Sequence, residues 1–151
     1  MSNFLDKINL HQNNQIEKMR KSNLIIERYG LYLDEKDIQD IVAIRNEVLE
    51  STHRFEFGDW IANKIITEFC DSPYIKKEEF KDIVCELLEI FYFCKNETKD
   101  LISDDDLIRF MKMNFDGVCN GSVEYLKDTV LSKMISDVLA NKPLEEKYER
   151  N

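Results

Sequence analysis

Apolar residues recur along this chain at steps of three and four, and this spacing restricts the fold more than any other feature of the sequence. On an α-helix, residues at such steps lie on one face, so each run predicts a rod with one apolar side. Four glycines and two prolines in 151 residues leave little material for the tight turns of many short strands. We therefore expect an all-α protein, a compact bundle of five to six helices in a single domain.

The expected helix ends follow from capping residues, glycines and prolines. Asp34, Ser103 and Ser122 can each accept a hydrogen bond from the free amides of a first helical turn. Gly30 suits the left-handed residue that ends a helix. A short extended piece or hairpin is expected near Phe55. The helices are expected at about residues 13–29, 34–53, 59–70, 77–94, 103–115 and 122–141.

The helical domain is expected to span residues 13–142, which leaves a short segment at each end. We expect residues 1–12 to be a flexible or docked N-terminal segment and residues 143–151 to be a charged, frayed tail. The first ten residues hold no long apolar run and no small-residue cleavage site, so we expect no signal peptide. No stretch approaches the ~18 apolar residues of a membrane span.

The formal charge of −9 is unevenly distributed. The first thirty residues carry five basic and three acidic side chains, whereas the rest of the chain carries 16 and 27. A body this acidic repels phosphate backbones and anionic headgroups, so we expect neither nucleic acid nor a membrane as a partner. Four cysteines are expected to be reduced thiols of a cytoplasmic protein: Cys70, Cys85, Cys94 and Cys119.

Sequence patterns that carry catalytic chemistry are absent or incomplete. The chain has two histidines, no Gly-x-Ser-x-Gly elbow, no Cys-x-x-Cys and no glycine-rich phosphate loop. Cys85 and Cys94 are nine residues apart, which places them on opposite sides of one helix and prevents a shared metal ion. We therefore expect a non-catalytic protein and assign no catalytic residue, no cofactor and no metal ligand.

The segment Asp116–Lys127 comes nearest to a ligand-binding motif, because it resembles the calcium loop of an EF-hand. Val118 stands where an oxygen ligand belongs, and Lys127 replaces the bidentate glutamate. The loop therefore leaves two alternatives, a degenerate metal-binding regulator or a plain helix–loop–helix turn. The residues that fit the first, fifth, sixth and ninth positions are Asp116, Asn120, Gly121 and Glu124.

Polar residues in the expected loops form a second set of candidates, since loops carry function more often than cores do. A pocket that joins several of them would indicate a small-molecule-binding protein or an enzyme with a loop-built polar site. The same residue types also serve as caps and turns. The candidates are Cys70, Asp71, Tyr74, Asn96, Glu97, Asp116, Asn120 and Glu124.

Aromatic residues outside the apolar stripes favour our leading hypothesis, a protein-interaction or regulatory helical domain. Aromatic side chains that cluster on a surface mark interfaces, although these residues also suit the edges of a core. The partner would be an unknown protein or a second copy of the chain, because two-fold dimers are the commonest soluble oligomers. These aromatics are Phe55, Phe57, Tyr74 and Tyr92.

Six segments carry a family resemblance: Tyr29–Leu31, Ala43–Glu47, Arg54–Gly58, Phe69–Ile75, Lys95–Thr98 and Phe115–Leu126. In this order they resemble a family of uncharacterised proteins from Firmicutes, named only as a domain of unknown function. The resemblance covers roughly residues 24–131. It implies a bacterial cytoplasmic protein of unassigned function, and it carries over no activity, ligand or partner.

Overall fold

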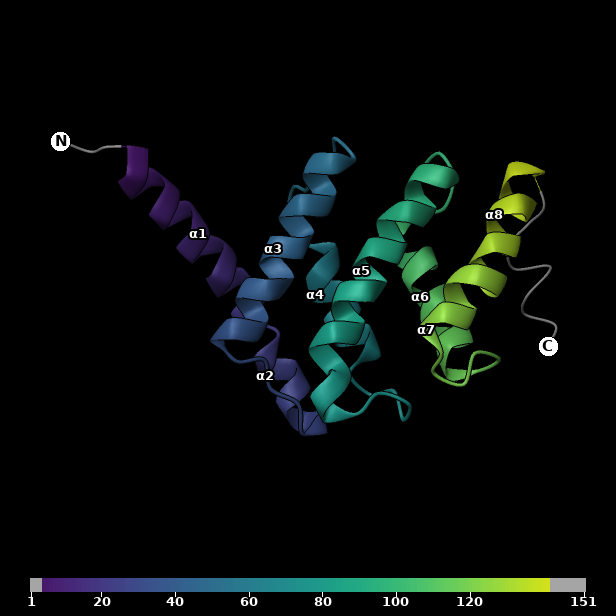
Figure 1. Ribbon diagram of the computed structural model, residues 1–151, viewed down its shortest axis with the longest axis horizontal. Helices are drawn as coiled ribbons and strands as arrows, with labels where there is room; N and C mark the ends of the chain where they lie inside the picture. Colours follow the sequence, from purple (N-terminus) through teal and green to yellow (C-terminus); the bar gives the residue numbers. More distant parts are fainter. Residues whose placement is uncertain (1–3, 142–151) are drawn as a thin grey trace.

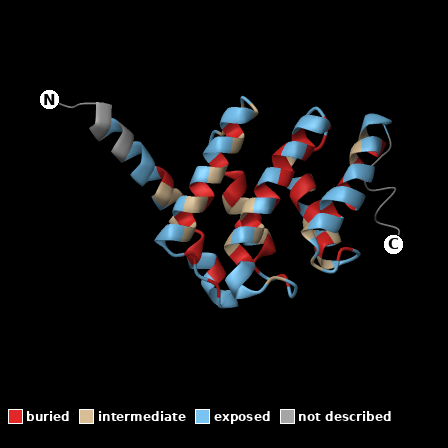
Figure 2. Cartoon of the chain, viewed as in Figure 1, coloured by how far each residue is buried: buried red, intermediate tan, exposed pale blue. Residues whose placement is uncertain are grey.

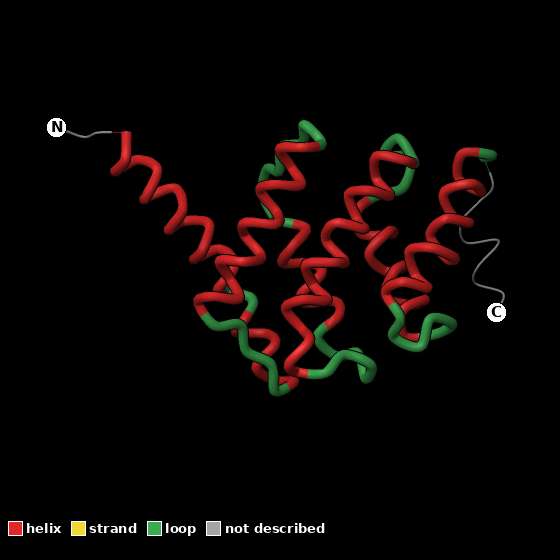
Figure 3. Tube along the Cα trace, viewed as in Figure 1, coloured by secondary structure: helices red, strands yellow, loops and turns green. Residues whose placement is uncertain are grey.

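The structure, a computed structural model, describes residues 4–141 and confirms the all-α bundle (Figures 1 and 3). The described residues form no strand, and none of their helices is long and apolar enough to cross a membrane. Two of the short helices, η1 and η2, are 3-10 helices, and η3 is a π-helix. The elements are α1 (Phe4–Arg20), α2 (Asn23–Ile26), η1 (Glu27–Tyr29), α3 (Glu35–Ser51), α4 (Ile61–Phe69), η2 (Lys77–Glu79), α5 (Phe80–Glu97), α6 (Asp104–Asp116), α7 (Val123–Tyr125), η3 (Leu126–Leu131) and α8 (Ser132–Leu139).

The helices form two layers around α5. In Figure 1, α1, α3, α5 and α8 follow one another along the long axis, and α4 and α6 lie behind them. Because α5 packs against α3, α4 and α7, it is buried on most sides, as its broad apolar surface predicts (Figure 2). Its buried side chains are Phe80, Val84, Leu87, Leu88, Ile90, Phe91, Tyr92, Cys94 and Lys95.

The first helix differs from the expected span of residues 13–29. It begins earlier, at Phe4, and ends at Arg20, so residues 4–12 of the predicted flexible or docked segment are helical. The chain turns after Arg20, where the side chain of Asn23 bonds to the backbone of Leu33, ten residues further along the chain. Nδ2 donates to the Leu33 carbonyl at 2.9 Å, and Oδ1 accepts from the Leu33 amide at 2.8 Å. In Figure 1 the first half of α1 reaches away from the body. The predicted tail, 143–151, lies outside the described residues.

The predicted helix caps are confirmed. Asp34 accepts from the Asp37 amide at 2.8 Å and the Asp37 side chain accepts in return from the Asp34 amide, which completes a capping box. Ser103 and Ser122 cap α6 and α7 through the amides three residues on. Gly30 adopts the left-handed conformation that ends η1, with φ of 76°.

The hairpin expected near Phe55 is wrong. Residues 54–57 belong to neither a helix nor a strand. The side chains of Arg54 and Glu56 bond instead to Asn96 of α5 and Arg45 of α3, so side chains hold this segment in the place of a paired strand.

The last expected helix, 122–141, is interrupted by the wide turns of η3. A π-helix fits an extra residue into each turn. Two consecutive side chains, Val130 and Leu131, are buried there, together with Leu126.

Candidate functional site

The segment Arg54–Gly58, which we name the aromatic segment, connects α3 to α4 and carries the two most exposed aromatic side chains of the described residues. Phe55 is 83% exposed and Phe57 is 90% exposed. Arg54 and Glu56 are partly buried, so burial alternates along the segment as it does in an extended chain. Two polar side chains thus face the protein, and two phenyl rings face solvent.

Glu56 makes the inner contact of the aromatic segment. Its side chain is only 10% exposed. One carboxylate oxygen accepts from Arg45 Nε at 2.9 Å, and the other accepts from the Ile61 amide at 3.1 Å and from the Tyr92 hydroxyl. The Ile61 amide lies in the first turn of α4, so it has no acceptor within the helix, and the helix dipole also favours a negative charge there. Glu56 therefore caps α4 from five residues upstream.

Arg45 and Tyr92 complete this buried network. The Arg45 guanidinium lies 3.4 Å from the centre of the Trp60 ring and donates to Asn46 Oδ1 at 2.9 Å. Burial, together with the hydrogen bond to Glu56, raises the pKa of Tyr92 well above its ordinary value. The phenol therefore stays protonated and donates to the carboxylate.

Arg54 makes the outer contact of the aromatic segment. Its guanidinium donates to both carboxylate oxygens of Asp100 at 3.0 Å. It also donates to Asn96 Oδ1 at 2.7 and 2.9 Å. The hydrogen bonds from Arg54 lower the pKa of Asp100. Two donors in a fixed fork give this pair a defined geometry as well as a charge.

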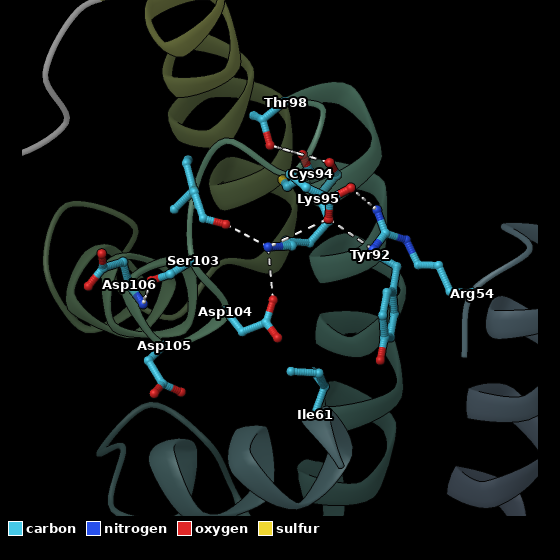
Figure 4. Close-up of polar contacts among 12 residues, drawn as sticks. Arg54, Ile61, Tyr92, Cys94, Lys95, Thr98, Ser103, Asp104, Asp105 and Asp106 are labelled. Atoms are coloured by element: carbon cyan, nitrogen blue, oxygen red, sulfur yellow. Dashed lines mark hydrogen bonds and ion pairs between the residues drawn. The ribbon is translucent and has the colours of Figure 1, made fainter. Parts of the chain in front are cut away.

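Asp100 lies in the loop between α5 and α6, and this loop is held by Lys95, a buried cation near the end of α5 (Figure 4). Lys95 Nζ lies 2.8 Å from Asp104 Oδ1, donates to the Ile102 carbonyl at 2.5 Å, and lies 3.7 Å from Asp100 Oδ1. A single ammonium thus holds the loop between α5 and α6 against both helices. Asp100 is consequently held in place for Arg54.

A second polar cluster lies at the other end of α5, where the α4–η2 loop meets the end of α6 (Figure 1). Ser72 donates to Asp116 Oδ1 at 2.6 Å, and Lys112 bridges Asp116 at 2.9 Å and Asp71 at 2.7 Å. Burial alone would lower the pKa of Lys112, but its hydrogen bonds to the two carboxylates raise it. Lys112 is therefore a charged structural bridge rather than a proton acceptor.

Tyr74 and Gly121 bring the two loops of this cluster into contact. The Tyr74 hydroxyl lies 3.3 Å from Asn120 Oδ1. Gly121 has φ of 81°, and a Cβ there would lie 2.4 Å from the Cβ of Tyr74. Only glycine combines this conformation with so close an approach.

The structure brings together only part of the predicted site. Asp71, Tyr74, Asp116 and Asn120 lie in the second cluster, whereas Asn96 lies in the Arg54 contact at the other end of α5. The 18 residues of α5 separate the two groups by about 27 Å. Of the other three candidates, Cys70 is buried beside Asp71, Glu97 is exposed next to Asn96 at the end of α5, and Glu124 lines a groove between α5 and α7.

The cysteines show no sign of nucleophilic activation. Burial raises the pKa of the Cys85 and Cys119 thiols to about 11 and that of Cys94 to about 12. Burial and the neighbouring Asp71 also raise the pKa of Cys70, whose Sγ lies 3.1 Å from the Thr67 carbonyl oxygen. Reactive cysteines have the opposite shift.

The EF-hand-like loop directs its first ligand residue into the protein. Both oxygens of Asp116 are engaged, one by Ser72 and the other by Lys112. Within residues 4–141, no group of three or more His, Cys, Asp or Glu side chains with known placement could hold a metal ion. The loop connects α6 to α7, and its first ligand residue is engaged by side chains of the protein.

Sequence reasoning missed the buried network around Glu56. Two signals for it were present in the sequence. Arg45 occupies a position in the apolar stripe of α3, where a cation needs a buried partner, and the order Arg-Phe-Glu-Phe alternates polar with apolar side chains. Tyr92, predicted to be a spare aromatic, is 3% exposed and belongs to this network.

The fold and its polar clusters define an all-α domain whose buried charges fix its loops. The chain belongs to a family of unknown function (DUF6323), which matches residues 18–143. This match confirms the resemblance to a domain of unknown function and extends it at both ends. No curated protein and no solved structure matches the chain.

Proposed function

We propose that this protein is a non-catalytic interaction module that acts in the bacterial cytoplasm and binds another protein chain through Phe55 and Phe57. The observation that carries this proposal is the exposure of both rings, 83% and 90%, on a segment in which Arg54 and Glu56 are partly buried and hydrogen-bonded. Burying one such ring in an interface stabilises a complex by about 2 kcal/mol.

The fixed backbone of the aromatic segment adds to this argument. A loop that is already ordered loses little conformational entropy when it binds, so more of the contact energy appears as affinity. Single exposed apolar residues are common on protein surfaces, but two exposed rings on one fixed segment, only two residues apart, are typical of an interface. The free thiols and the resemblance to Firmicutes proteins support a reducing bacterial cytoplasm.

Site-specific photo-cross-linking in the producing cell tests the proposal. Replacing Phe55 or Phe57 with benzoylphenylalanine keeps an aromatic side chain at each position and reports any protein that lies against it. Met113 on α6, which is 50% exposed, is the matched control position. We expect a discrete adduct from positions 55 and 57, and mass spectrometry identifies it as a second copy or as a different protein.

The same adduct should be lost when the remaining phenylalanine is changed to serine in each cross-linking variant. Surface substitutions of this kind change the free energy of unfolding by no more than about 0.5 kcal/mol, so a lost adduct would report a lost contact. If positions 55 and 57 gave no adduct beyond that of position 113, the proposal would be wrong.

A further inference from the structure

A groove of about 480 Å³ lies between α5 and the helix formed by α7 and η3. In Figure 1, α7 and α3 lie on opposite sides of α5. The groove shares no residue with the aromatic segment. Its apolar part comes from both helices, and Phe93, one of these residues, is 46% exposed. The apolar lining residues are Ile90, Phe93 and Val123.

Four carboxylates surround this apolar part, and all four side chains are exposed. None of them takes part in an ion pair between described residues, although many other carboxylates of the chain do. Lys127 is the one cation among the lining residues, and it lies 5.9 Å from the centre of the Phe93 ring. The carboxylates are Glu86 and Glu89 of α5, Glu124 of α7 and Asp128 of η3.

The spacing of these residues matches the surface that a packed helix needs. Glu86, Glu89, Ile90 and Phe93 follow one another at steps of three, one and three, so they form one face of α5. Side chains of a third helix can pack between two neighbouring helices, with its apolar ridge against the apolar residues. Lysine and arginine stems then lie along the apolar surface while their charged ends reach the carboxylates.

We propose that this groove binds a lysine- or arginine-rich amphipathic helix of another protein. Charge complementarity selects this occupant, because four carboxylates without an ion pair to any described residue repel acidic and phosphorylated partners from the apolar residues between them. The described lining residues form no group that could hold a metal ion, which favours an organic cation over a divalent metal. The inference is independent of the proposed role of Phe55 and Phe57.

Fluorescence anisotropy with a labelled 14-residue leucine–lysine peptide, designed as an amphipathic helix, tests the proposal on the full chain. We expect this peptide to bind at least tenfold more tightly than a glycine–serine–lysine peptide of equal charge, which has no apolar face. The triple variant Glu86→Gln, Glu89→Gln, Glu124→Gln should weaken binding about tenfold. Phe93→Ala, which keeps every carboxylate, should weaken it several-fold.

The matched control is Glu27→Gln, Glu47→Gln, Glu50→Gln, which removes the same charge from exposed glutamates of η1 and α3. It should weaken binding less than threefold. Equal weakening by both triple variants would mean that only net charge attracts the peptide, and the proposal would be overturned. It would be overturned as well if the two peptides bound equally or if neither bound. Thermal unfolding of each variant verifies that it is folded.

Discussion

The Arg45 guanidinium lies 3.4 Å from the centre of the Trp60 ring while its Nε donates to Glu56 at 2.9 Å. One buried cation therefore contacts both the aromatic residue that precedes α4 and the carboxylate that caps this helix. The position of the exposed phenyl rings depends on this contact, because Glu56 lies between them in the chain.

Replacing Glu56 should cost more stability than its small size suggests. Glu56→Ala leaves Arg45 as a buried charge without its carboxylate and removes the acceptor for Tyr92 and the Ile61 amide. We expect the free energy of unfolding to fall by about 3 kcal/mol, measured by urea denaturation. Glu50→Ala, an exposed control on α3, should change it by no more than about 0.5 kcal/mol. Equal losses in the two variants would contradict the buried network.

The pair between Arg54 and Asp100 should make stability depend on pH. The pKa of Asp100 is lowered in the folded state, so its contribution is complete above the ordinary carboxyl pKa of about 3.9 and is lost as the pH falls through the lowered value. Asp100→Asn should therefore cost about 0.5 to 1 kcal/mol at pH 7 and almost nothing near pH 2. Denaturant titrations at several pH values measure this difference.

Asparagine is a suitable substitute at position 100, because Asp100 has φ of 59° and asparagine tolerates this left-handed conformation. Asp128→Asn, at an exposed carboxylate without an ion pair among the described residues, is the control and should change the free energy of unfolding at pH 7 by no more than about 0.5 kcal/mol. A cost for Asp100→Asn that persisted unchanged at pH 2 would rule out the charged pair as its origin.

Replacing two glycines in turn distinguishes the stability cost of a steric clash from the cost of backbone strain. Gly58 and Gly121 have φ of 84° and 81°, but only Gly121 has a neighbour that an added Cβ would meet, the Tyr74 Cβ at 2.4 Å. Gly58→Ala should cost about 1 kcal/mol, whereas Gly121→Ala should cost about 3 kcal/mol or more. Equal costs, measured by thermal unfolding, would show that the two loops can move apart without penalty.

The thiols should react slowly in the folded protein. With a pKa of about 11, a thiol is ionised in about one molecule in a thousand at pH 8. We expect Ellman's reagent to react at least about a hundredfold faster in 8 M urea than with the native chain. A native cysteine that reacted rapidly would instead indicate an activated nucleophile and would support the alternative of an enzyme.

Helices and their caps could be predicted from the sequence because both are local. The stripe of α5 and the caps Asp34, Ser103 and Ser122 depend on residues within one or two turns of each other. The break after Arg20 was not predictable in this way, since it depends on Asn23 reaching Leu33. The π-turns of η3 were likewise not predicted from the apolar spacing of residues 122–141.

The polar residues could be located in loops, but their partners could not be predicted. Asp116 and Asn120 suggested a calcium loop, yet the structure places Ser72 and Tyr74, more than forty residues away in the chain, against them. Glu56 was overlooked because its partners Arg45 and Tyr92 lie on two different helices. Contacts between residues that are far apart in the chain could not be predicted from this one sequence.

The π-helix Leu126–Leu131 is a place where the chain could lose one residue and keep its fold. A turn of this kind contains one residue more than an α-turn for a similar advance along the axis. Deleting one residue there would allow ordinary α-turns to form while α8 keeps its orientation. The same deletion in the middle of α5 would rotate every later side chain by about 100° and expose its apolar stripe. Among natural relatives, we expect single-residue deletions in this part of the chain to be tolerated.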